Sequence, residues 1–157
     1  MVDCLIIGGG PAGLLAALYL GRYCRTVRVI DAGESRAAKI PTSHNYPGFF
    51  GISGPDLLRR LSGQAEQFGA RLTSDRVTSL RKEKATFAAS CSGADVYARF
   101  VLLATGLVDH CPPIEAEPNC SSEAVRFCPI CDGYEAIDRR VGRRCSYALT
   151  PETSHFF

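Results

Sequence analysis

Residues 2–31 read VDCLIIGGGPAGLLAALYLGRYCRTVRVID, and they are the most informative part of the chain. The stretch divides into an apolar run, a glycine-rich turn, a helical run and a second apolar run, at residues 2–7, 8–13, 14–23 and 26–30. The two apolar runs are rich in β-branched residues and predict buried parallel strands, the second followed at once by Asp31. The turn between the first strand and the helix matches the pattern G-x-G-x-x-G.

Each part of this pattern has a physical role in a dinucleotide site. Gly8 permits the tight turn, Gly10 lets the backbone approach a pyrophosphate, and Gly13 lets the helix pack close to the strand. The start of the helix offers unpaired N–H groups and a positive dipole end to the phosphates. Asp31 lies eighteen positions after Gly13, close to the spacing expected for a carboxylate that binds a ribose hydroxyl.

The uncharged segment Cys4–Gly21 has a second interpretation, as a membrane span or a signal segment. A run of three glycines followed by a proline, at residues 8–11, interrupts it, and no cationic segment precedes it. We therefore favour the nucleotide fold and expect no membrane association.

Composition narrows the function classes further. The chain has 157 residues, 18 basic and 16 acidic side chains, and a net charge of +2, which is ordinary for one soluble globular domain. Its basic residues form no stripe, so nucleic acid is a poor candidate partner. The eight cysteines without a secretory signal indicate a cytoplasmic protein with mostly reduced thiols.

Beyond Asp31 we expect a long functional loop, Ala32–Pro55, and a helix capped by Ser53 or Gly54 with Pro55 in its first turn. The apolar face of this helix carries residues 57, 58, 61, 65 and 68. Three strands are expected next, with turns at 82–84 and 92–94; the strands are Arg71–Leu80, Ala85–Cys91 and Val96–Thr105. Thr105 and Gly106 then lie at a carboxyl strand end, where open α/β sheets bind ligands.

The C-x-x-C pair of Cys128 and Cys131, followed by Asp132, has three interpretations. The first is thiol–disulfide exchange, with Asp132 shuttling a proton. The second is a zinc site completed by Cys111 and Cys120, although the spacing is not the paired one of convincing zinc sites. The third is two idle or buried thiols.

Taken together, these motifs resemble the N-terminal half of thioredoxin reductase-like flavoproteins. The matching stretches occur in the family's order: GGGPAGL at 8–14, the acid at 31, HNYPGF at 44–49, GISGPDLL at 51–58, LLATGL at 102–107 and CPICDGY at 128–134. The resemblance implies a Rossmann-like α/β fold, a parallel sheet with a β-meander. It places an FAD-binding domain at residues 1–117 and the incomplete start of an NADPH-binding domain at 118–157.

The resemblance also implies roles for individual residues. The FAD pyrophosphate would be held by Gly8, Gly10, Ala12 and Gly13, and the ribose by Asp31. Asn45 would face the flavin, Val77 would approach the adenine on the first meander strand, and Thr105 and Gly106 would lie beside FAD.

In similar enzymes NADPH reduces FAD, FAD reduces the C-x-x-C disulfide, and the dithiol reduces a partner. By this analogy Cys131 is the sulfur nearer the flavin, Cys128 attacks the substrate, and Asp132 donates the proton. The implied partner is a thioredoxin-like protein or a small disulfide, and a homodimer is consistent with the resemblance.

The sequence departs from the family after Arg140. Residues 141–157 contain one glycine and no second glycine-rich turn, so no NADPH site is assigned. The later segment that completes the flavin site is also absent, and we expect a truncated or frame-shifted product with the native frame lost near Gly142. The alternatives to a disulfide reductase are a non-catalytic FAD-binding fragment and a flavin oxidoreductase without a dithiol step. We also expect exposed apolar surface on the sheet.

Overall fold

The computed structural model describes residues 1–109, 128, 131 and 133–138. The chain divides into two compact units, Met1–Val125 and Arg126–Phe157. The larger unit contains the whole described sheet with its helices, and the smaller unit contains the cysteine pair. The predicted domain boundary between residues 117 and 118 stays a prediction.

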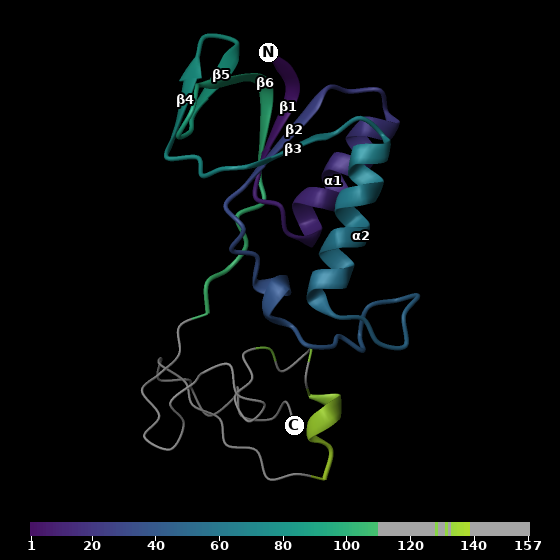
Figure 1. The fold of residues 1–157 in the computed structure, drawn as a ribbon. Helices are drawn as coiled ribbons and strands as arrows, with labels where there is room; N and C mark the ends of the chain where they lie inside the picture. The colour runs from purple at the N-terminus through teal and green to yellow at the C-terminus, as the bar shows by residue number, and fades with distance from the viewer. Residues whose placement is uncertain (110–127, 129–130, 132, 139–157) are drawn as a thin grey trace, which may run out of the picture. The chain divides into compact units, whose positions relative to one another are not determined.

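The larger unit is built on one six-stranded sheet with the order β3-β2-β1-β6-β5-β4 (Figure 1). The strands are β1 (Val2–Ile7), β2 (Val27–Asp31), β3 (Arg71–Ser74), β4 (Ser79–Glu83), β5 (Thr86–Ser90) and β6 (Val96–Leu103). Strands β3, β2, β1 and β6 are parallel, and β6, β5 and β4 are antiparallel. The predicted parallel sheet with a meander is therefore confirmed.

Two helices, α1 (Pro11–Arg22) and α2 (Gly54–Gln67), lie on one side of the sheet (Figure 1). They bury small residues, including Ala17 and Ala65, against Cys4 and Ile6 of β1 and Val29 of β2. Small residues at these positions let the helix backbones come close to the strands. These contacts hold α1 against β1, immediately after the turn of residues 8–10.

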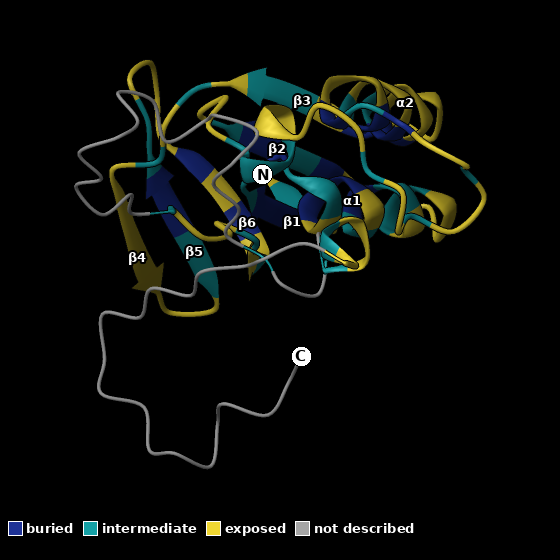
Figure 2. Ribbon diagram, turned by 90° about the horizontal axis from the view of Figure 1, so that it is seen from below, coloured by how far each residue is buried: buried dark blue, intermediate teal, exposed yellow. Residues whose placement is uncertain are grey.

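A second apolar cluster joins the parallel and the antiparallel parts of the sheet. Leu5 and Ile30 pack there with Ala89, Val96 and Ala98. Buried segments lie along β1 and β5 and on the two helices, whereas all of β4 is exposed (Figure 2). The meander is thus attached to the parallel strands through β5 and β6, and β4 forms an edge.

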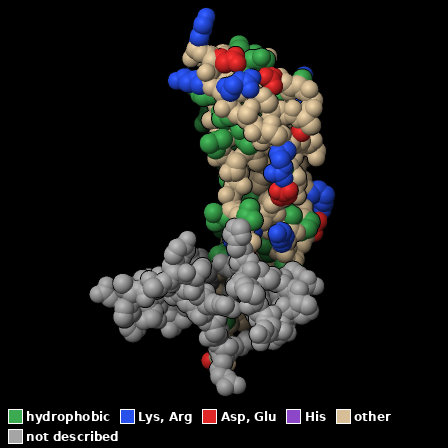
Figure 3. All heavy atoms as spheres, turned by 90° about the vertical axis from the view of Figure 1, so that its left-hand side faces the viewer, with side chains coloured by type: hydrophobic (Ala, Val, Ile, Leu, Met, Phe, Trp, Pro, Cys, Tyr) green, Lys and Arg blue, Asp and Glu red, His purple; other side chains and the backbone are tan. Residues whose placement is uncertain are grey.

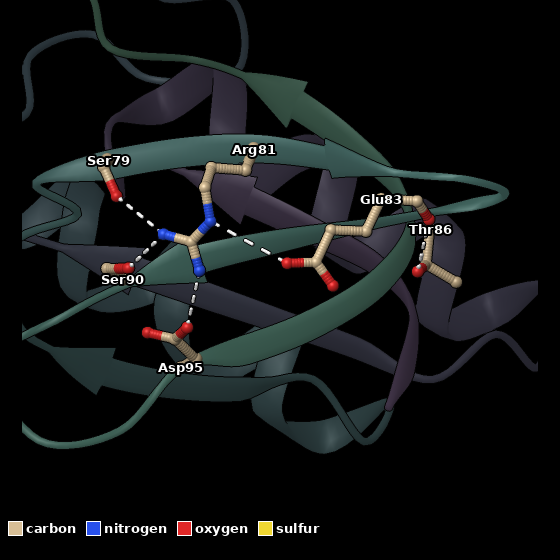
Figure 4. A network of polar contacts seen from close by, with 6 residues as sticks. All are labelled: Ser79, Arg81, Glu83, Thr86, Ser90 and Asp95. Atoms are coloured by element: carbon tan, nitrogen blue, oxygen red, sulfur yellow. Dashed lines mark hydrogen bonds and ion pairs between the residues drawn. The ribbon is translucent and has the colours of Figure 1, made fainter.

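The outer hairpin is held by a polar network centred on Arg81 of β4 (Figure 4). Its guanidinium donates to Ser90 Oγ on β5 at 3.1 Å and to Asp95 Oδ2, just before β6, at 2.9 Å. Glu83 lies 3.8 Å from the same side chain. Lys and Arg are interspersed with Asp and Glu on this side of the larger unit (Figure 3).

The structure corrects several local predictions. Helix α1 begins at Pro11 rather than Leu14, because Gly10 already provides the extended N-cap. Helix α2 is capped by Ser53, whose hydroxyl accepts a hydrogen bond from the Asp56 N–H, as one of the two predicted caps requires. Phe68, predicted on the buried face, is the C-cap residue and is 38% exposed.

The largest correction concerns the segment predicted as one strand, Arg71–Leu80. It forms two strands on opposite edges of the sheet, β3 and β4, joined by residues 75–78. The turn after β4 lies at residues 84–85, with Lys84 at φ +53°, rather than at 82–84. The residues of this segment fit a strand pattern throughout. That pattern therefore did not indicate that the chain crosses from one edge of the sheet to the other.

Two further surface features matter for the sequence predictions. The expected exposed apolar surface is present on β6, where Phe100 and Leu103 are 63% and 64% exposed. Within the described ranges, no helix has the length and apolar character needed to span a membrane.

Candidate dinucleotide site and cysteine pair

The glycine-rich turn leaves β1 at the carboxyl end of the parallel strands and is held by both neighbouring strands. The Gly8 N–H donates to the Ile30 carbonyl at 2.9 Å, which ties the turn to β2. On the other side, a Cβ on Gly8 would lie 2.3 Å from the Ala104 carbonyl oxygen, and Gly8 has a φ of +109°. Both the backbone conformation and the space therefore require glycine.

Gly13 brings helix α1 onto this turn. A Cβ at this position would lie 2.0 Å from the Gly8 carbonyl oxygen, far inside van der Waals contact. The helix has no side-chain cap at Gly10, and its first described intrahelical bond runs from the Leu14 N–H to the Gly10 carbonyl at 3.0 Å. The N–H groups of Ala12 and Gly13 precede that bond, in the first turn, where a helix has no intrahelical acceptors to offer.

Asp31, at the end of β2, lies against the same turn. Its Oδ1 accepts a hydrogen bond from the Gly9 N–H at 3.0 Å. A Cβ on Gly9 would lie 2.6 Å from the Asp31 Cγ, so glycine at position 9 is needed to admit the carboxylate. Gly9 received no role from the sequence, although the run of three glycines was a signal that could have indicated one.

A pocket of about 300 Å³ opens beside Gly9 and Asp31. Its outer wall is made by Thr73 and Ser74 at the end of β3, together with Ser62 of α2. Hydroxyl groups next to a carboxylate suit a ligand rich in hydroxyls, such as a ribose. None of the three was predicted: the pairing of β2 with β3 brings Thr73 and Ser74 to Asp31, and helix α2 brings Ser62.

Thr105 and Gly106 also reach this end of the sheet. The Ala104 N–H donates to the Ile7 carbonyl at 2.8 Å, so the segment after β6 runs alongside the end of β1. The Thr105 nitrogen lies 3.2 Å from where a Gly8 Cβ would be, and Gly106 has a φ of +71°. The fold therefore brings Gly8, Gly13, Asp31 and Thr105 together from three strands.

Asn45 and Val77 lie in connections rather than in this cluster. Asn45 is exposed on the 32–53 loop, and its Oδ1 accepts a hydrogen bond from the Ser43 hydroxyl at 2.8 Å. Val77 lies between β3 and β4 and packs against the Leu5 and Ile30 cluster, so its predicted place on a meander strand is wrong. Neither Asn45 nor Val77 makes a described contact with the glycine turn.

The predicted redox pair, Cys128 and Cys131, is joined in a disulfide with Cα atoms 5.2 Å apart. The Cys131 N–H donates to the Cys128 carbonyl at 3.1 Å, which closes a short turn around the pair. The disulfide argues against two idle thiols. Cysteines joined in a disulfide also provide no thiolate that could bind zinc. Asp132, Cys111 and Cys120 lie outside the described residues, within which no cluster suited to a metal ion occurs.

The remaining described cysteines are Cys4, Cys24 and Cys91. Cys4 is buried, and burial raises the pKa of its thiol. Cys24 is exposed, with a φ of +57° at the end of α1.

A strand–turn–helix with an acid at the end of the neighbouring strand defines the class of dinucleotide-binding α/β proteins. Comparison with known families narrows this class. A model described as pyridine nucleotide-disulphide oxidoreductase matches residues 2–144, and the chain belongs to this family.

Individual relatives place the similarity among thioredoxin reductases. The chain is 35% identical over 134 residues to the thioredoxin reductase of Listeria monocytogenes, covering 83% of this chain and 42% of that protein. It is also 35% identical over 138 residues to NADPH-dependent thioredoxin reductase 3 of Arabidopsis thaliana, covering 83% and 26%.

Among solved structures, the thioredoxin reductase of Streptococcus pyogenes aligns with a TM-score of 0.78 and 32% identity, covering 85% of this chain and 44% of that one. The predicted resemblance to this branch is confirmed. The chain spans less than half the length of these relatives.

Proposed function

We propose that this chain is the FAD-binding part of a flavin-dependent disulfide oxidoreductase whose Cys128–Cys131 disulfide passes electrons to a partner disulfide. The observation that supports this most directly is the meeting of the Gly8 turn, the α1 N-terminus and the Asp31 carboxylate at one sheet end. A disulfide at the second motif of the same family supports the redox part.

The residues at the sheet end fit FAD in shape and in donor chemistry. The uncapped start of α1 offers N–H groups to a pyrophosphate, and Gly10 has no atom closer to a built Cβ than the Ser35 hydroxyl at 3.2 Å. In the proposal the pyrophosphate is bound by Gly8, Gly10, Ala12 and Gly13.

The remaining parts of the cofactor are assigned to the surrounding segments. Asp31 accepts from a ribose hydroxyl in the pocket that it forms with Thr73 and Ser74. In the proposal Val77, which packs against the Leu5 and Ile30 cluster, approaches the adenine. Thr105 and Gly106 lie along the cofactor beside the turn, and Asn45 faces the flavin. When bound, FAD supplies two-electron chemistry between a nicotinamide and a disulfide.

The cysteine pair performs the exchange with the partner. Reduction of the Cys128–Cys131 disulfide by two electrons and two protons yields two thiols. The Cys128 thiolate attacks one sulfur of the partner disulfide and the partner's other sulfur leaves as a thiolate, forming a mixed disulfide. Cys131 then attacks Cys128, which restores the intramolecular disulfide and releases the second partner sulfur. In the proposal Asp132 moves the proton to and from these sulfurs.

The names of the relatives support a choice of reductant and acceptor. NADPH stands in the name of the Arabidopsis relative and thioredoxin in the names of most others, so we propose NADPH as the electron source and a thioredoxin-like protein as the acceptor. A small disulfide is the alternative acceptor, and the cytoplasm is the proposed location. No residue of this chain is assigned to NADPH.

A second candidate is an FAD-binding module without turnover of its own. Every residue that we assign to FAD lies in the Met1–Val125 unit, whereas the disulfide lies in the other unit. This division favours the second candidate. A flavin enzyme without a dithiol step is disfavoured by the disulfide itself.

Removing the Asp31 charge tests the cofactor assignment. We expect the purified chain to bind FAD and to show a flavin absorbance spectrum after gel filtration. The D31N variant should bind FAD about 10-fold to 100-fold more weakly, because a hydrogen bond to a charged group contributes about 1.5–3 kcal/mol. The control D95N removes a carboxylate from the far hairpin and should leave the FAD dissociation constant unchanged. A colourless wild-type chain in excess FAD would contradict the proposal.

Counting thiols tests the dithiol. After reduction, wild-type chain should expose two more reactive thiols than the C128S/C131S double variant. In oxidised chain the two proteins should give equal counts, because the native pair is closed in a disulfide. An unequal count in the oxidised state would count against the pair.

A further inference from the structure

One ion pair near the proposed FAD site belongs to none of the motifs. Arg36 Nε donates to Asp109 Oδ2 at 2.6 Å, between residues 73 positions apart. The two side chains are only 33% and 22% exposed. A half-buried contact of this kind is less screened by solvent than a surface pair, so it holds its geometry more firmly.

The two residues come from the two segments that border the site. Asp109 lies three residues after Gly106, on the segment that leaves β6 beside the Gly8 turn. Arg36 begins the short 3₁₀ helix η1 (Arg36–Lys39) in the loop that follows Asp31 and continues to Asn45. The pair therefore links the loop of Asn45 with the segment of Thr105 and Gly106.

Helix η1 is itself fixed to the rest of the site. The Gly54 N–H at the start of α2 donates to the Ile40 carbonyl at 2.9 Å, and a Cβ on Gly54 would lie 1.7 Å from the Ala37 carbonyl oxygen. On its other side, Ser35 Oγ lies 3.2 Å from where a Gly10 Cβ would be. Arg36 thus projects from a turn held between α2 and the glycine turn.

The neighbouring pair on the same loop offers a contrast. Glu34 binds Arg76 in the β3–β4 connection, with both side chains more than half exposed. Exposed pairs of this kind contribute little to a fixed geometry because solvent and salt screen them. The Arg36–Asp109 pair is therefore the better candidate for setting the distance between two walls.

We propose that Arg36 and Asp109 are positioning residues that hold the 32–53 loop and the 104–109 segment at the separation that FAD requires. The proposal rests on the FAD site proposed above. Pre-setting two walls lowers the ordering cost of ligand binding, so loss of the pair should weaken affinity without removing a contact to the ligand. Neither residue needs to touch the cofactor.

Charge-neutral and charge-exchanged variants test this role. R36Q and D109N should each raise the FAD dissociation constant about tenfold, a typical coupling between linked parts of a site. The double variant R36Q/D109N should be no worse than either single one, because the two residues act as a unit. The exchange R36D/D109R should recover at least half of the lost affinity, expressed as the logarithm of the dissociation constant.

The matched control is R81Q, which breaks an Arg–Asp pair on the far hairpin (Figure 4). It should lower the thermal midpoint of FAD-free chain at least as much as R36Q and leave the FAD dissociation constant within twofold. That result separates positioning from general loss of stability. D109N, which is close in shape to the native side chain, keeps the test available when R36Q folds poorly.

The outcomes distinguish the positioning role from the proposed FAD site on which it rests. If the wild-type chain binds FAD and the dissociation constant is unchanged in R36Q and D109N, the positioning role is overturned. The proposed FAD site is not affected by that result. Equal weakening by R81Q and R36Q also overturns it. A wild-type chain that binds no FAD contradicts the FAD site itself, and the positioning role with it.

Discussion

At the scale of single residues, the turn after β1 depends on glycines that have no room for a side chain. Gly13 is the most restricted of them, since a Cβ would meet the Gly8 carbonyl oxygen at 2.0 Å. That oxygen belongs to the turn itself, so relief requires α1 to move away from β1. Gly63, on the exposed side of α2, has no atom within 4 Å of a built Cβ and serves as a natural contrast.

Alanine at these two positions should act in opposite directions. G13A should lower the free energy of unfolding by about 3 kcal/mol, because the added methyl group displaces backbone rather than a flexible side chain. G63A should raise it by about 1 kcal/mol, since alanine is the better residue inside a helix. Urea unfolding of both variants followed by circular dichroism gives the two signs. Equal effects would show that the Gly13 contact is not restrictive.

At the scale of elements, the end of α1 contains a paired hydrogen-bond motif with an unusual residue. The Cys24 N–H donates to the Gly21 carbonyl at 2.8 Å and the Arg25 N–H to the Leu20 carbonyl at 3.0 Å. This is the Schellman arrangement, in which the residue after the C-cap takes the left-handed conformation and is usually glycine. Here that residue is Cys24, with a φ of +57°.

Glycine at position 24 should therefore stabilise the protein. Relief of left-handed strain outweighs the larger backbone entropy of glycine in the unfolded chain, for a net gain of about 0.5–1 kcal/mol in C24G. The variant C24A removes the same sulfur but keeps the Cβ, and should show no gain. Thermal melts under reducing conditions distinguish the two, and an equal rise in both would assign the effect to the thiol.

At the scale of the whole molecule, Asp3 connects three elements of the sheet. Its carboxylate accepts hydrogen bonds from the Thr26 N–H at 2.9 Å and the Thr26 hydroxyl at 2.8 Å, ahead of β2. Arg99 of β6 donates to the other oxygen at 3.3 Å. These partners, Thr26 first, lower the pKa of Asp3 below its ordinary value of 3.8.

The lowered pKa predicts the direction of acid sensitivity. Because the folded state binds the Asp3 proton more weakly, the stabilisation is complete above the ordinary pKa of 3.8 and is lost as the pH falls through the lower folded-state pKa. D3N should therefore have a lower urea midpoint than wild type at pH 7, and the two midpoints should converge as the solution is acidified. A constant difference across that range would contradict the assignment.

Local pattern was sufficient for much of the fold and for the centre of the site. The strand of residues 2–7, the Ser53 cap and the glycine turn depend on neighbours in sequence, so their prediction was accurate. The segment 71–80 was predicted wrongly, because its residues satisfy a strand pattern while the chain crosses from one edge of the sheet to the other. Arg36 and Asp109 were missed, because no local pattern pairs residues 73 positions apart.

The sequence by itself determined the family, the class of fold and the positions of Gly8, Gly13 and Asp31, because steric limits on a turn and periodic burial act over a few residues. The tertiary structure alone decided which groups meet at the sheet end. It put Thr105 next to Gly8, Thr73 in the pocket beside Asp31, and Asp109 on Arg36. The physical reason is strand pairing: once β2, β1 and β6 are parallel neighbours, their carboxyl ends converge whatever the length of chain between them.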